Sequence, residues 1–380
     1  MKPTALRHRV GSLLIVGVES TALSALETAW LRSLQPSGVI LFRRNVESAA
    51  QLHALWRQAA KELSQPFFRT VDLEGGTVDR LRDMVGPTPS AAEVAATRQP
   101  EIFREHGAFV GCMLHSLGFN LDLAPVLDLA LPAALPVMGT RVVSRDPASV
   151  VPYAEEFLGG LAQHDVLGCG KHFPGLGGGN LDSHQATPNI PRTWEQIWHE
   201  DLEPYRKLAG KLPLVMVNHA AYPKIERLEI DRSAIKQPAP PASLSRFWIQ
   251  EVLRGKLHYR GLVISDDMEM GGVLQRRSPE EAAIAAIAAG TDLLEICHRA
   301  DRILATHEAL LGEAERSPAF ARCVQRAATR VASAKQRLLG KSPLPRALSK
   351  AGLQQLQKAQ QRLRDKVMLA NLSAPRGTAR

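Results

Sequence analysis

The stretch KHFPGLGGGNLDSH, residues 171 to 184, holds the densest group of reactive side chains in this 380-residue sequence. Lys171 and His172 precede a glycine-rich segment, and Asp182 and His184 follow it. A carboxylate two residues from an imidazole can orient the ring and adjust its pKa, which suits a histidine that exchanges a proton. Because glycines make the segment flexible, we expect Asp182 and His184 to lie on a loop that moves over a bound ligand.

The same residue types allow two other interpretations. An Asp-x-His sequence also occurs in solvated turns, and His172, Asp182 and His184 could together bind a metal ion. No HExxH or similar ligand spacing supports a metal site, so we expect none. At the end of a strand, Lys171 and His172 would instead hold the hydroxyl groups of a ligand.

Two further segments place carboxylates directly after apolar runs. In VISDDMEM, Asp266 and Asp267 alternate in direction on a strand, so one should point inward as a nucleophile or electrostatic stabiliser, and the other could cap the next helix. In DLEGGTVDRLR, Asp72 and Glu74 precede two glycines that let the backbone approach a ligand closely. Arg80 could return to that site, or it could form a structural ion pair there.

Eight short apolar runs, most of them separated by segments with helical spacing, must position these residues. This pattern predicts parallel strands covered by helices, and the count predicts an α/β fold of the (β/α)8 TIM-barrel type. An open doubly wound sheet is disfavoured because no GxGxxG or GxxxxGK turn follows the first run. The runs are SLLIVGV from Ser12, GVILF from Gly38, FFRTVDLE from Phe67, FNLDLAPVLDL from Phe119, LGCGKHF from Leu167, LPLVMVNHA from Leu212, GLVISDD from Gly261 and DLLEICH from Asp292.

Polar residues cluster where these runs end, and in a barrel all such ends meet on one face. We therefore expect a single pocket. The strand-end residues are Asp72, Glu74, Asp128, Lys171, His172, Asn218, His219, Asp266 and Asp267. We expect residues 1–340 to form the catalytic domain. After the break KSPLPRALS, residues 341–380 should form a basic helical extension that packs on the barrel or on another subunit.

Charge and cysteine content restrict the partners and the compartment. The net charge is +9, but the segment 341–380 holds nine Lys and Arg against Asp365, so the remainder is nearly neutral and we expect no nucleic-acid ligand. The apolar run SLLIVGV is too short for a membrane span and lacks a cleavage site, so it predicts a buried strand and no membrane association. The four scattered cysteines indicate reduced thiols in a cytoplasmic protein.

The sequence resembles the family 3 glycoside hydrolases, specifically the bacterial single-domain β-N-acetylglucosaminidases of peptidoglycan recycling. Matching segments run in order from Gly38 to Cys297: GVILFRRN, DLEGG with a later Arg, APVLD, GTRVVSRDP, KHFPG with DSH, VNHAAYP, ISDDMEM and AGTDLLEIC. KHFPG followed by DSH at this spacing is specific for the N-acetylglucosaminidase branch, and the other segments are specific for the wider family.

The resemblance implies a role for each matching residue. Asp266 would be the nucleophile, His184 the general acid/base and Asp182 its partner. The terminal N-acetylglucosamine would be bound by Asp72, Arg80, Arg141, Lys171 and His172. The resemblance also implies a GlcNAc-anhydromuramyl substrate, cleaved at its β-1,4 bond, and no metal or organic cofactor. We expect a monomer or a weak homodimer.

Three positions depart from the family pattern. Leu176 stands where relatives usually have His, Leu73 where they have Gln, and Thr77 where they have Arg. None is a principal catalytic position, but a lost polar group beside the acid/base loop could alter loop closure. Leu176 makes a muropeptide-binding sensor without catalysis one alternative. A family 3 β-glucosidase or β-xylosidase, which would share the nucleophile, is the other. Phosphorolysis in place of hydrolysis is also open, since a histidine acid/base leaves the acceptor site less negative than a glutamate would.

Overall fold

Eight parallel strands form a closed barrel in the computed structural model, which describes residues 3–63, 66–179, 187–225, 239–274, 277–340 and 343–373. The predicted barrel is confirmed, and each strand lies within one of the eight predicted runs. Around the barrel the order is β1-β10-β9-β8-β7-β6-β3-β2. The strands are β1 (Leu14–Gly17), β2 (Gly38–Leu41), β3 (Phe68–Val71), β6 (Leu121–Asp122), β7 (Leu167–Phe173), β8 (Leu214–Val217), β9 (Leu262–Asp267) and β10 (Leu293–Ile296).

The chain turns after β3 into a small antiparallel hairpin, β4 (Leu73–Gly75) and β5 (Val78–Asp79). The sequence predicted a single strand from Phe67 to Glu74, and this prediction is wrong. The barrel strand ends at Val71, and Gly75 and Gly76 take φ values of 80° and 58° that favour glycine. The hairpin holds Glu74 at the mouth of the barrel.

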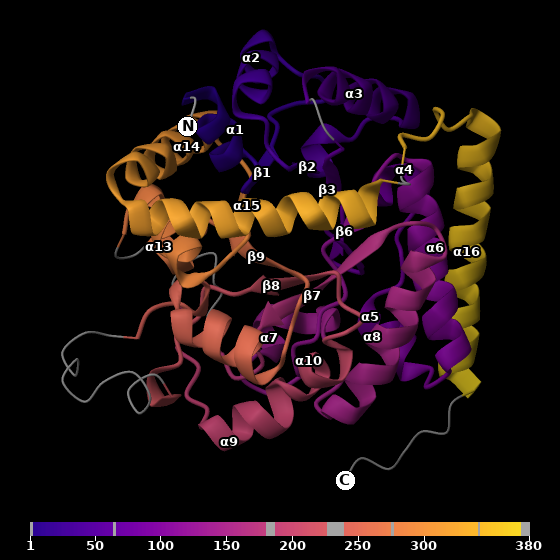
Figure 1. Cartoon of the computed structure of the whole chain (residues 1–380). Helices are drawn as coiled ribbons and strands as arrows, with labels where there is room; N and C mark the ends of the chain where they lie inside the picture. The colour runs from indigo at the N-terminus through magenta and orange to yellow at the C-terminus, as the bar shows by residue number, and fades with distance from the viewer. Residues whose placement is uncertain are drawn as a thin grey trace.

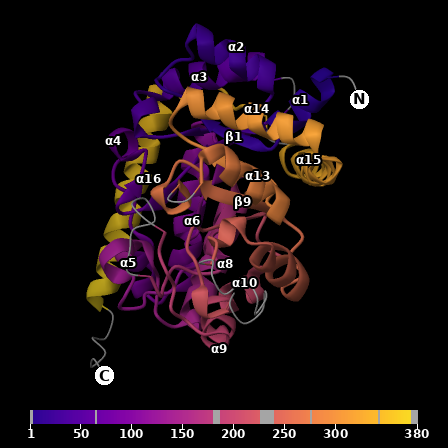
Figure 2. The ribbon, with the colours of Figure 1, turned by 90° about the vertical axis from the view of Figure 1, so that its left-hand side faces the viewer.

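Helices cover the outside of the strands, as Figures 1 and 2 show. Serine caps start several of them: Ser24 and Ser278 each accept a hydrogen bond from a Glu backbone N–H three residues later. The longer helices are α1 (Pro3–Gly11), α2 (Ala25–Leu34), α3 (Ala49–Glu62), α6 (Pro100–Ser116), α8 (Pro147–Ala162), Phe247–Lys256, α13 (Pro279–Ala289), α14 (Ala300–Arg316) and α15 (Pro318–Leu339). Shorter ones are α4 (Arg82–Val85), α5 (Ala91–Ala96), α7 (Leu135–Met138), α9 (Trp194–Gln196), α10 (Glu203–Leu208) and α12 (Gly271–Leu274).

The barrel interior is filled by inward-facing apolar side chains from alternate strand positions. Leu293 on β10 and Cys297 directly after it belong to this interior cluster, so Glu295 between them also faces inward. Helix α15 crosses in front of the strands in Figure 1, and its Val331, Ala334 and Leu339 pack into the same cluster. No helix among the described residues is long and apolar enough to cross a membrane.

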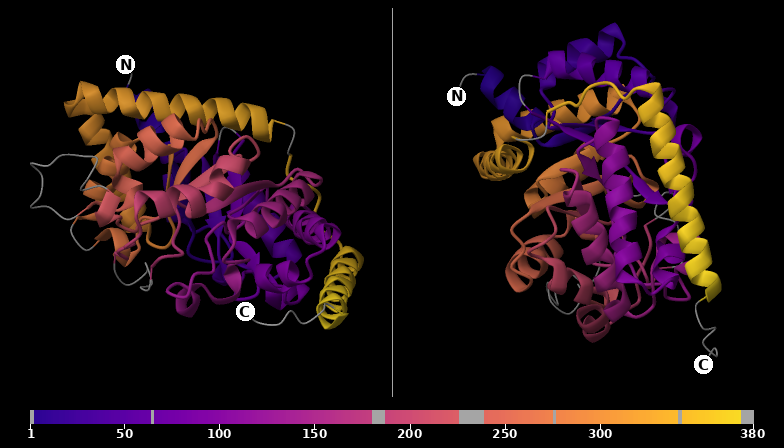
Figure 3. Two further views of the ribbon diagram at one scale, coloured as in Figure 1. Left: turned by 90° about the horizontal axis from the view of Figure 1, so that it is seen from below. Right: turned by 90° about the vertical axis from the view of Figure 1, so that its right-hand side faces the viewer.

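The last helix, α16 (Lys350–Ser373), lies along the outside of the barrel beside α6, as Figures 1 and 3 show. It buries Leu356, Leu363 and Val367 together with the polar Gln360. Gln360 donates a hydrogen bond of 2.5 Å to the carbonyl of Pro87, in the segment that follows the β4–β5 hairpin. Of the two packing surfaces expected for this segment, α16 therefore contacts the barrel of its own chain.

Candidate active site

A cavity of about 360 Å³ opens at the carboxyl ends of the barrel strands. Every predicted site residue that the structure describes lines this cavity: Asp72, Arg80, Arg141, Lys171, His172 and Asp266. The predicted acid/base pair, Asp182 and His184, lies outside the described residues. Six residues separated by up to 194 positions in sequence are thus brought to one pocket, as expected for strand ends in a barrel.

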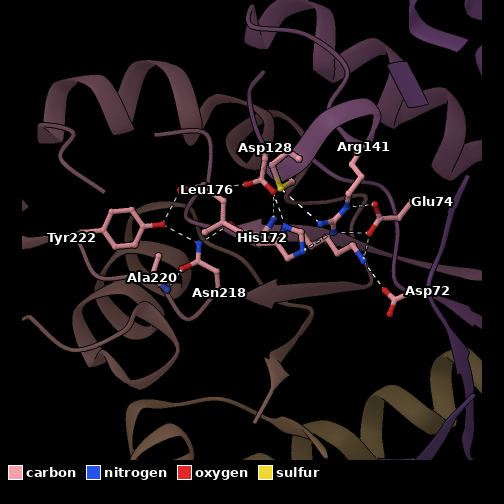
Figure 4. A network of polar contacts seen from close by, with 12 residues as sticks. Asp72, Glu74, Asp128, Arg141, His172, Leu176, Asn218, Ala220 and Tyr222 are labelled. Carbon is pink, nitrogen blue, oxygen red and sulfur yellow. Dashed lines mark hydrogen bonds and ion pairs between the residues drawn. The ribbon is translucent and has the colours of Figure 1, made fainter. Parts of the chain in front are cut away.

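A buried ionic cluster forms one wall of the cavity (Figure 4). The Lys171 ammonium, at the end of β7, lies 2.6 Å from an Asp72 oxygen and 2.7 Å from a Glu74 oxygen. The Arg141 guanidinium pairs with both Glu74 oxygens, at 2.7 and 2.9 Å. We call Asp72, Glu74, Arg141 and Lys171 the pocket cluster. Its two cations and two carboxylates satisfy each other in a place where unpaired charges would be costly.

The charges in the pocket cluster shift one another's pKa values. Burial raises the pKa of Glu74, but Lys171 and Arg141 more than offset this, and the pKa lies well below its usual range. Burial lowers the pKa of Lys171, and the neighbouring carboxylates Asp72 and Glu74 raise it above its usual value in the balance. Glu74 is therefore ionised and Lys171 cationic at neutral pH, so the wall presents fixed charges to a ligand.

Arg80 lies at the edge of this wall and is bound less tightly. One of its terminal nitrogens is 3.9 Å from an Asp72 oxygen, and its buried Nε has no hydrogen-bond partner among the described residues. The structural ion pair considered for Arg80 thus exists, but Asp72 makes its shorter contact with Lys171. Arg80 keeps donors that a ligand can use.

Asp128 orients His172 and the start of the glycine-rich loop. One Asp128 oxygen lies 2.6 Å from His172 Nδ1, and the other accepts a hydrogen bond of 2.7 Å from the Leu176 N–H. With Nδ1 bound to the carboxylate, His172 Nε2 is directed toward Arg141, 3.4 Å away. Leu176 itself lines the cavity, so the departure from the family pattern lies in the pocket.

Asn218 and Tyr222 hold the base of the same loop. The Asn218 amide donates to the His172 carbonyl at 3.0 Å and to the Tyr222 hydroxyl at 2.9 Å. The Tyr222 hydroxyl in turn donates to the Gly175 carbonyl at 2.8 Å. Side-chain hydrogen bonds therefore fix the backbone at the start of the glycine-rich segment, from His172 to Gly175.

Asp266 and Asp267 both line the cavity, so the expectation that only one would face it is wrong. The register between β9 and β10 shifts between Leu293 and Glu295, which breaks strict alternation at this point. Asp267 accepts a hydrogen bond from the Glu269 N–H in a local turn and lies 3.3 Å from His298, so it does not cap a helix. Asp266 accepts one from the Asp267 N–H at 2.9 Å.

The pKa of Asp266 lies below its ordinary value. Burial raises it, but His172 and His219, the Asp267 N–H and Lys171 lower it by more. Asp266 is therefore a carboxylate at neutral pH, and it lines the cavity. It forms no salt bridge with another of the described residues. Such a carboxylate can act as a nucleophile.

Sequence reasoning placed Glu74 and Asp128 among the strand-end residues of the expected pocket but assigned neither of them a role in it. Both follow strands, which was the available signal, but neither has a motif that shows its partner. Within the part of the chain that the structure describes, no group of three or more His, Cys, Asp and Glu side chains could hold a metal ion. The metal alternative needs Asp182 and His184, which lie outside that part.

A barrel with an ionised carboxylate in its pocket is compatible with a glycoside hydrolase, and comparison with known proteins identifies the family. Residues 5–334 match the glycosyl hydrolase family 3 N-terminal domain. The chain therefore belongs to glycosyl hydrolase family 3. It is 36% identical over 289 residues to a β-hexosaminidase of Tolumonas auensis, covering 75% of this chain and 82% of that protein. A β-hexosaminidase of Pseudomonas aeruginosa is 35% identical, with 76% and 82% covered.

A solved structure supports the same assignment over more of the chain. The family 3 β-N-acetylglucosaminidase from Paenibacillus sp. FPU-7 superposes with a TM-score of 0.85 at 29% identity and covers 95% of this chain and 68% of that one. This coverage of 95% exceeds the 75% and 76% of the chain covered by the two β-hexosaminidases, so the shared fold extends beyond the part of the chain that those sequences match.

Proposed function

We propose that this family 3 β-N-acetylhexosaminidase removes the terminal non-reducing GlcNAc from β-1,4-linked muropeptide fragments with net retention. The observation that carries the proposal is Asp266, an ionised carboxylate at the end of β9 in a cavity that is also lined by the cations Arg80, Arg141 and Lys171. The curated relatives named above are β-hexosaminidases, which favours an N-acetylated sugar over glucose or xylose.

In the proposed mechanism, Asp266 attacks the anomeric carbon while His184 protonates the departing oxygen. The glycosyl–Asp266 ester that forms is hydrolysed by water, which neutral His184 activates as a base. Ionised Asp182 favours the protonated form of His184 that the first step needs. Most retaining glycosidases use a second carboxylic acid, about 5 Å from the nucleophile, in the place proposed here for His184.

Asp72, Arg80, Arg141, Lys171 and His172 are proposed to bind the GlcNAc ring. Hydroxyl groups can accept from the cationic donors of Arg80 and Lys171 and donate to Asp72, whose side chain is 19% exposed. A cavity of about 360 Å³ is at the small end of ligand sites, which suits one terminal sugar residue. The rest of the substrate would extend outward, as in exo-acting enzymes.

The remaining parts of the proposal concern the whole molecule. We propose that residues 1–340 are the catalytic domain and residues 341–380 an extension, consistent with the family match ending at residue 334. The four cysteines are unpaired, which supports a cytoplasmic location. We propose a monomer or a weak homodimer with no cofactor, and a GlcNAc-anhydromuramyl fragment as substrate.

The decisive experiment measures p-nitrophenol release from the β-N-acetylglucosaminide by the wild type and by Asp266→Ala, without added metal. We expect wild-type turnover and a loss of kcat of about 10³-fold or more in the variant. Aryl glucoside and xyloside serve as controls, and faster turnover of either would favour the β-glucosidase or β-xylosidase alternative. Binding of muropeptide without turnover would favour the sensor.

The acid/base assignment has its own test. Asp182→Ala and His184→Ala should lose less activity on an activated aryl leaving group than on a natural disaccharide, because only the poor leaving group needs protonation. Equal losses on both substrates would contradict the assignment. Adding phosphate to the same assays and identifying the product as GlcNAc or its 1-phosphate distinguishes hydrolysis from phosphorolysis.

A further inference from the structure

Glu295 is an acidic residue in the middle of β10, and the family resemblance assigns it no role. Its side chain faces the barrel interior, lines the cavity, and the residue is only 2% exposed. Its backbone is fully used: the N–H donates to the Ser265 hydroxyl at 3.1 Å, and the carbonyl accepts from the Met268 N–H at 2.9 Å. The carboxyl oxygen Oε1, in contrast, is buried and has no hydrogen-bond partner among the described residues.

The groups around Glu295 favour its neutral form. Burial raises its pKa well above the usual value, and Asp72, Asp266 and Asp267 raise it further. Lys171 acts in the opposite direction but is already paired with Asp72 and Glu74. On the other side, β1 places the apolar Ile15 beside it. A neutral carboxyl carries one O–H donor as well as acceptor oxygens, which is the set that a sugar hydroxyl can match.

We infer that Glu295 is a specificity-determining residue at the floor of the pocket, where its carboxyl group exchanges a hydrogen bond with one hydroxyl of the bound pyranose. The inference rests on the proposed function, since it assumes that a sugar ring occupies the cavity. Leaving a buried polar group unpaired is unfavourable, so a ligand hydroxyl that hydrogen-bonds the Glu295 carboxyl group where it lines the cavity gains more than one that exchanges water for a surface partner. An analogue without this hydroxyl would leave the carboxyl group unpaired again, which is how a hydrogen-bonding site rejects a deoxy substrate.

The test combines substitutions at Glu295 with aryl β-N-acetylglucosaminides that lack the 3-, 4- or 6-hydroxyl. We expect Glu295→Leu to lose about tenfold in kcat/KM on the parent substrate. On one of the three deoxy substrates, Glu295→Leu and wild type should have equal kcat/KM, because the partner hydroxyl is already gone. Glu295→Gln keeps a donor and an acceptor and should lose less than threefold on the parent.

Glu269→Gln is the matched control, since it makes the same acid-to-amide change beside β9 at a residue that does not line the cavity. The ratio of its kcat/KM to that of wild type should be the same on all four substrates. A loss in Glu295→Leu that is equal on all four substrates, no loss at all, or a Gln variant as impaired as the Leu variant would overturn the inference. If Glu295→Leu fails to fold, the pattern of Glu295→Gln across the deoxy series decides alone.

The outcomes separate this inference from the proposed function. Wild-type turnover of the N-acetylglucosaminide supports the proposed function whatever Glu295 does. Turnover without hydroxyl-specific coupling to Glu295 contradicts only the inference about Glu295. A folded wild type that releases no p-nitrophenol overturns both, because no sugar would then be shown to occupy the pocket productively.

Discussion

Two buried ionic clusters lie at opposite ends of the barrel, and they differ in what they leave unpaired. The pocket cluster lies at the carboxyl ends of the strands. The other, which we call the base cluster, is centred on Asp292 just before β10 and includes Arg254 and Arg330. Each Asp292 oxygen lies 2.6 Å from one arginine, and one of them also accepts the Val263 N–H at 2.9 Å.

The base cluster is closed, whereas the pocket cluster opens on a cavity. Asp292 is completely buried and both of its oxygens are paired. Around the pocket cluster, Arg80 Nε and Glu295 Oε1 have no partner among the described residues, and Asp72 is partly exposed. A charged residue next to a strand therefore does not by itself mark a functional site. Two features distinguish a candidate binding site from a purely structural ion pair: its place at the carboxyl end of the barrel, and polar atoms that still lack a hydrogen-bond partner.

The largest effect is expected from Lys171→Met, which removes the cation shared by Asp72 and Glu74. The buried Glu74 and the partly exposed Asp72 would then lack their shared cation, so we expect a loss of about 3–5 kcal/mol in the free energy of unfolding. In the folded fraction, kcat/KM should fall about 10²-fold or more if Lys171 binds the sugar as proposed. Urea unfolding and aryl N-acetylglucosaminide kinetics measure the two effects. A stability loss with unchanged kcat/KM would make the pocket cluster as purely structural as the base cluster.

Asp292→Ala tests the base cluster and should affect stability alone. The two arginines would lose their shared partner, but Arg330 is partly exposed, so we expect a smaller loss of about 2–3 kcal/mol. KM and kcat should stay within twofold of wild type below the unfolding transition. A change in KM larger than this would show that the two ends of the barrel are coupled. It would contradict the assignment of a purely structural role to the base cluster.

Glu74→Gln tests the pocket cluster through the pH dependence of the free energy of unfolding. Because the pKa of Glu74 in the folded protein is below its unfolded value, Glu74 contributes stability that is present above the unfolded pKa, about 4.3, and is lost as pH falls below it. The variant should be about 1–3 kcal/mol less stable at pH 7 and lose less additional stability between pH 5 and pH 3.

Glu308→Gln is the control for this pH series. Glu308 pairs with Arg7 at 2.6 Å on the surface, where its side chain is 56% exposed. An exposed pair contributes little, so we expect a change below about 0.5 kcal/mol at pH 7. If the free energy of unfolding of Glu74→Gln fell as steeply as that of wild type between pH 5 and pH 3, another carboxylate would dominate the pH dependence of stability.

The sequence predicted more of the frame than of its internal pairings. Eight apolar runs contain the eight strands because buried parallel strands need continuous apolar sequence, a local property. The partnership of Glu74 with Arg141, 67 positions apart, depends on a hairpin that two glycines create and on a loop after β6. Asp128 and His172 are similarly joined only by the closed barrel. Such pairings depend on distances between strand ends, which no local pattern encodes.

The smallest expected effect tests how α16 supports the pocket. Gln360 donates to the Pro87 carbonyl, and the next residue, Thr88, accepts from the Gly76 N–H and donates to Asp79, both in or beside the β4–β5 hairpin. Gln360→Ala should lower the free energy of unfolding by about 1–2 kcal/mol. Because the hairpin carries Glu74 toward the pocket, KM should rise two- to threefold while kcat is unchanged. This rise corresponds to a loss of ~0.5 kcal/mol in binding free energy.

Gln361→Ala is the matched control one residue along the helix. Gln361 is exposed, and its side chain donates a hydrogen bond to Asp365 of the same helix. It should change stability by less than about 0.5 kcal/mol and leave KM as in wild type. If both variants raise KM equally, the effect comes from the helix as a whole and not from the Gln360 contact. If Gln360→Ala loses stability but keeps KM, α16 supports the barrel as the base cluster does, without reaching the sugar site.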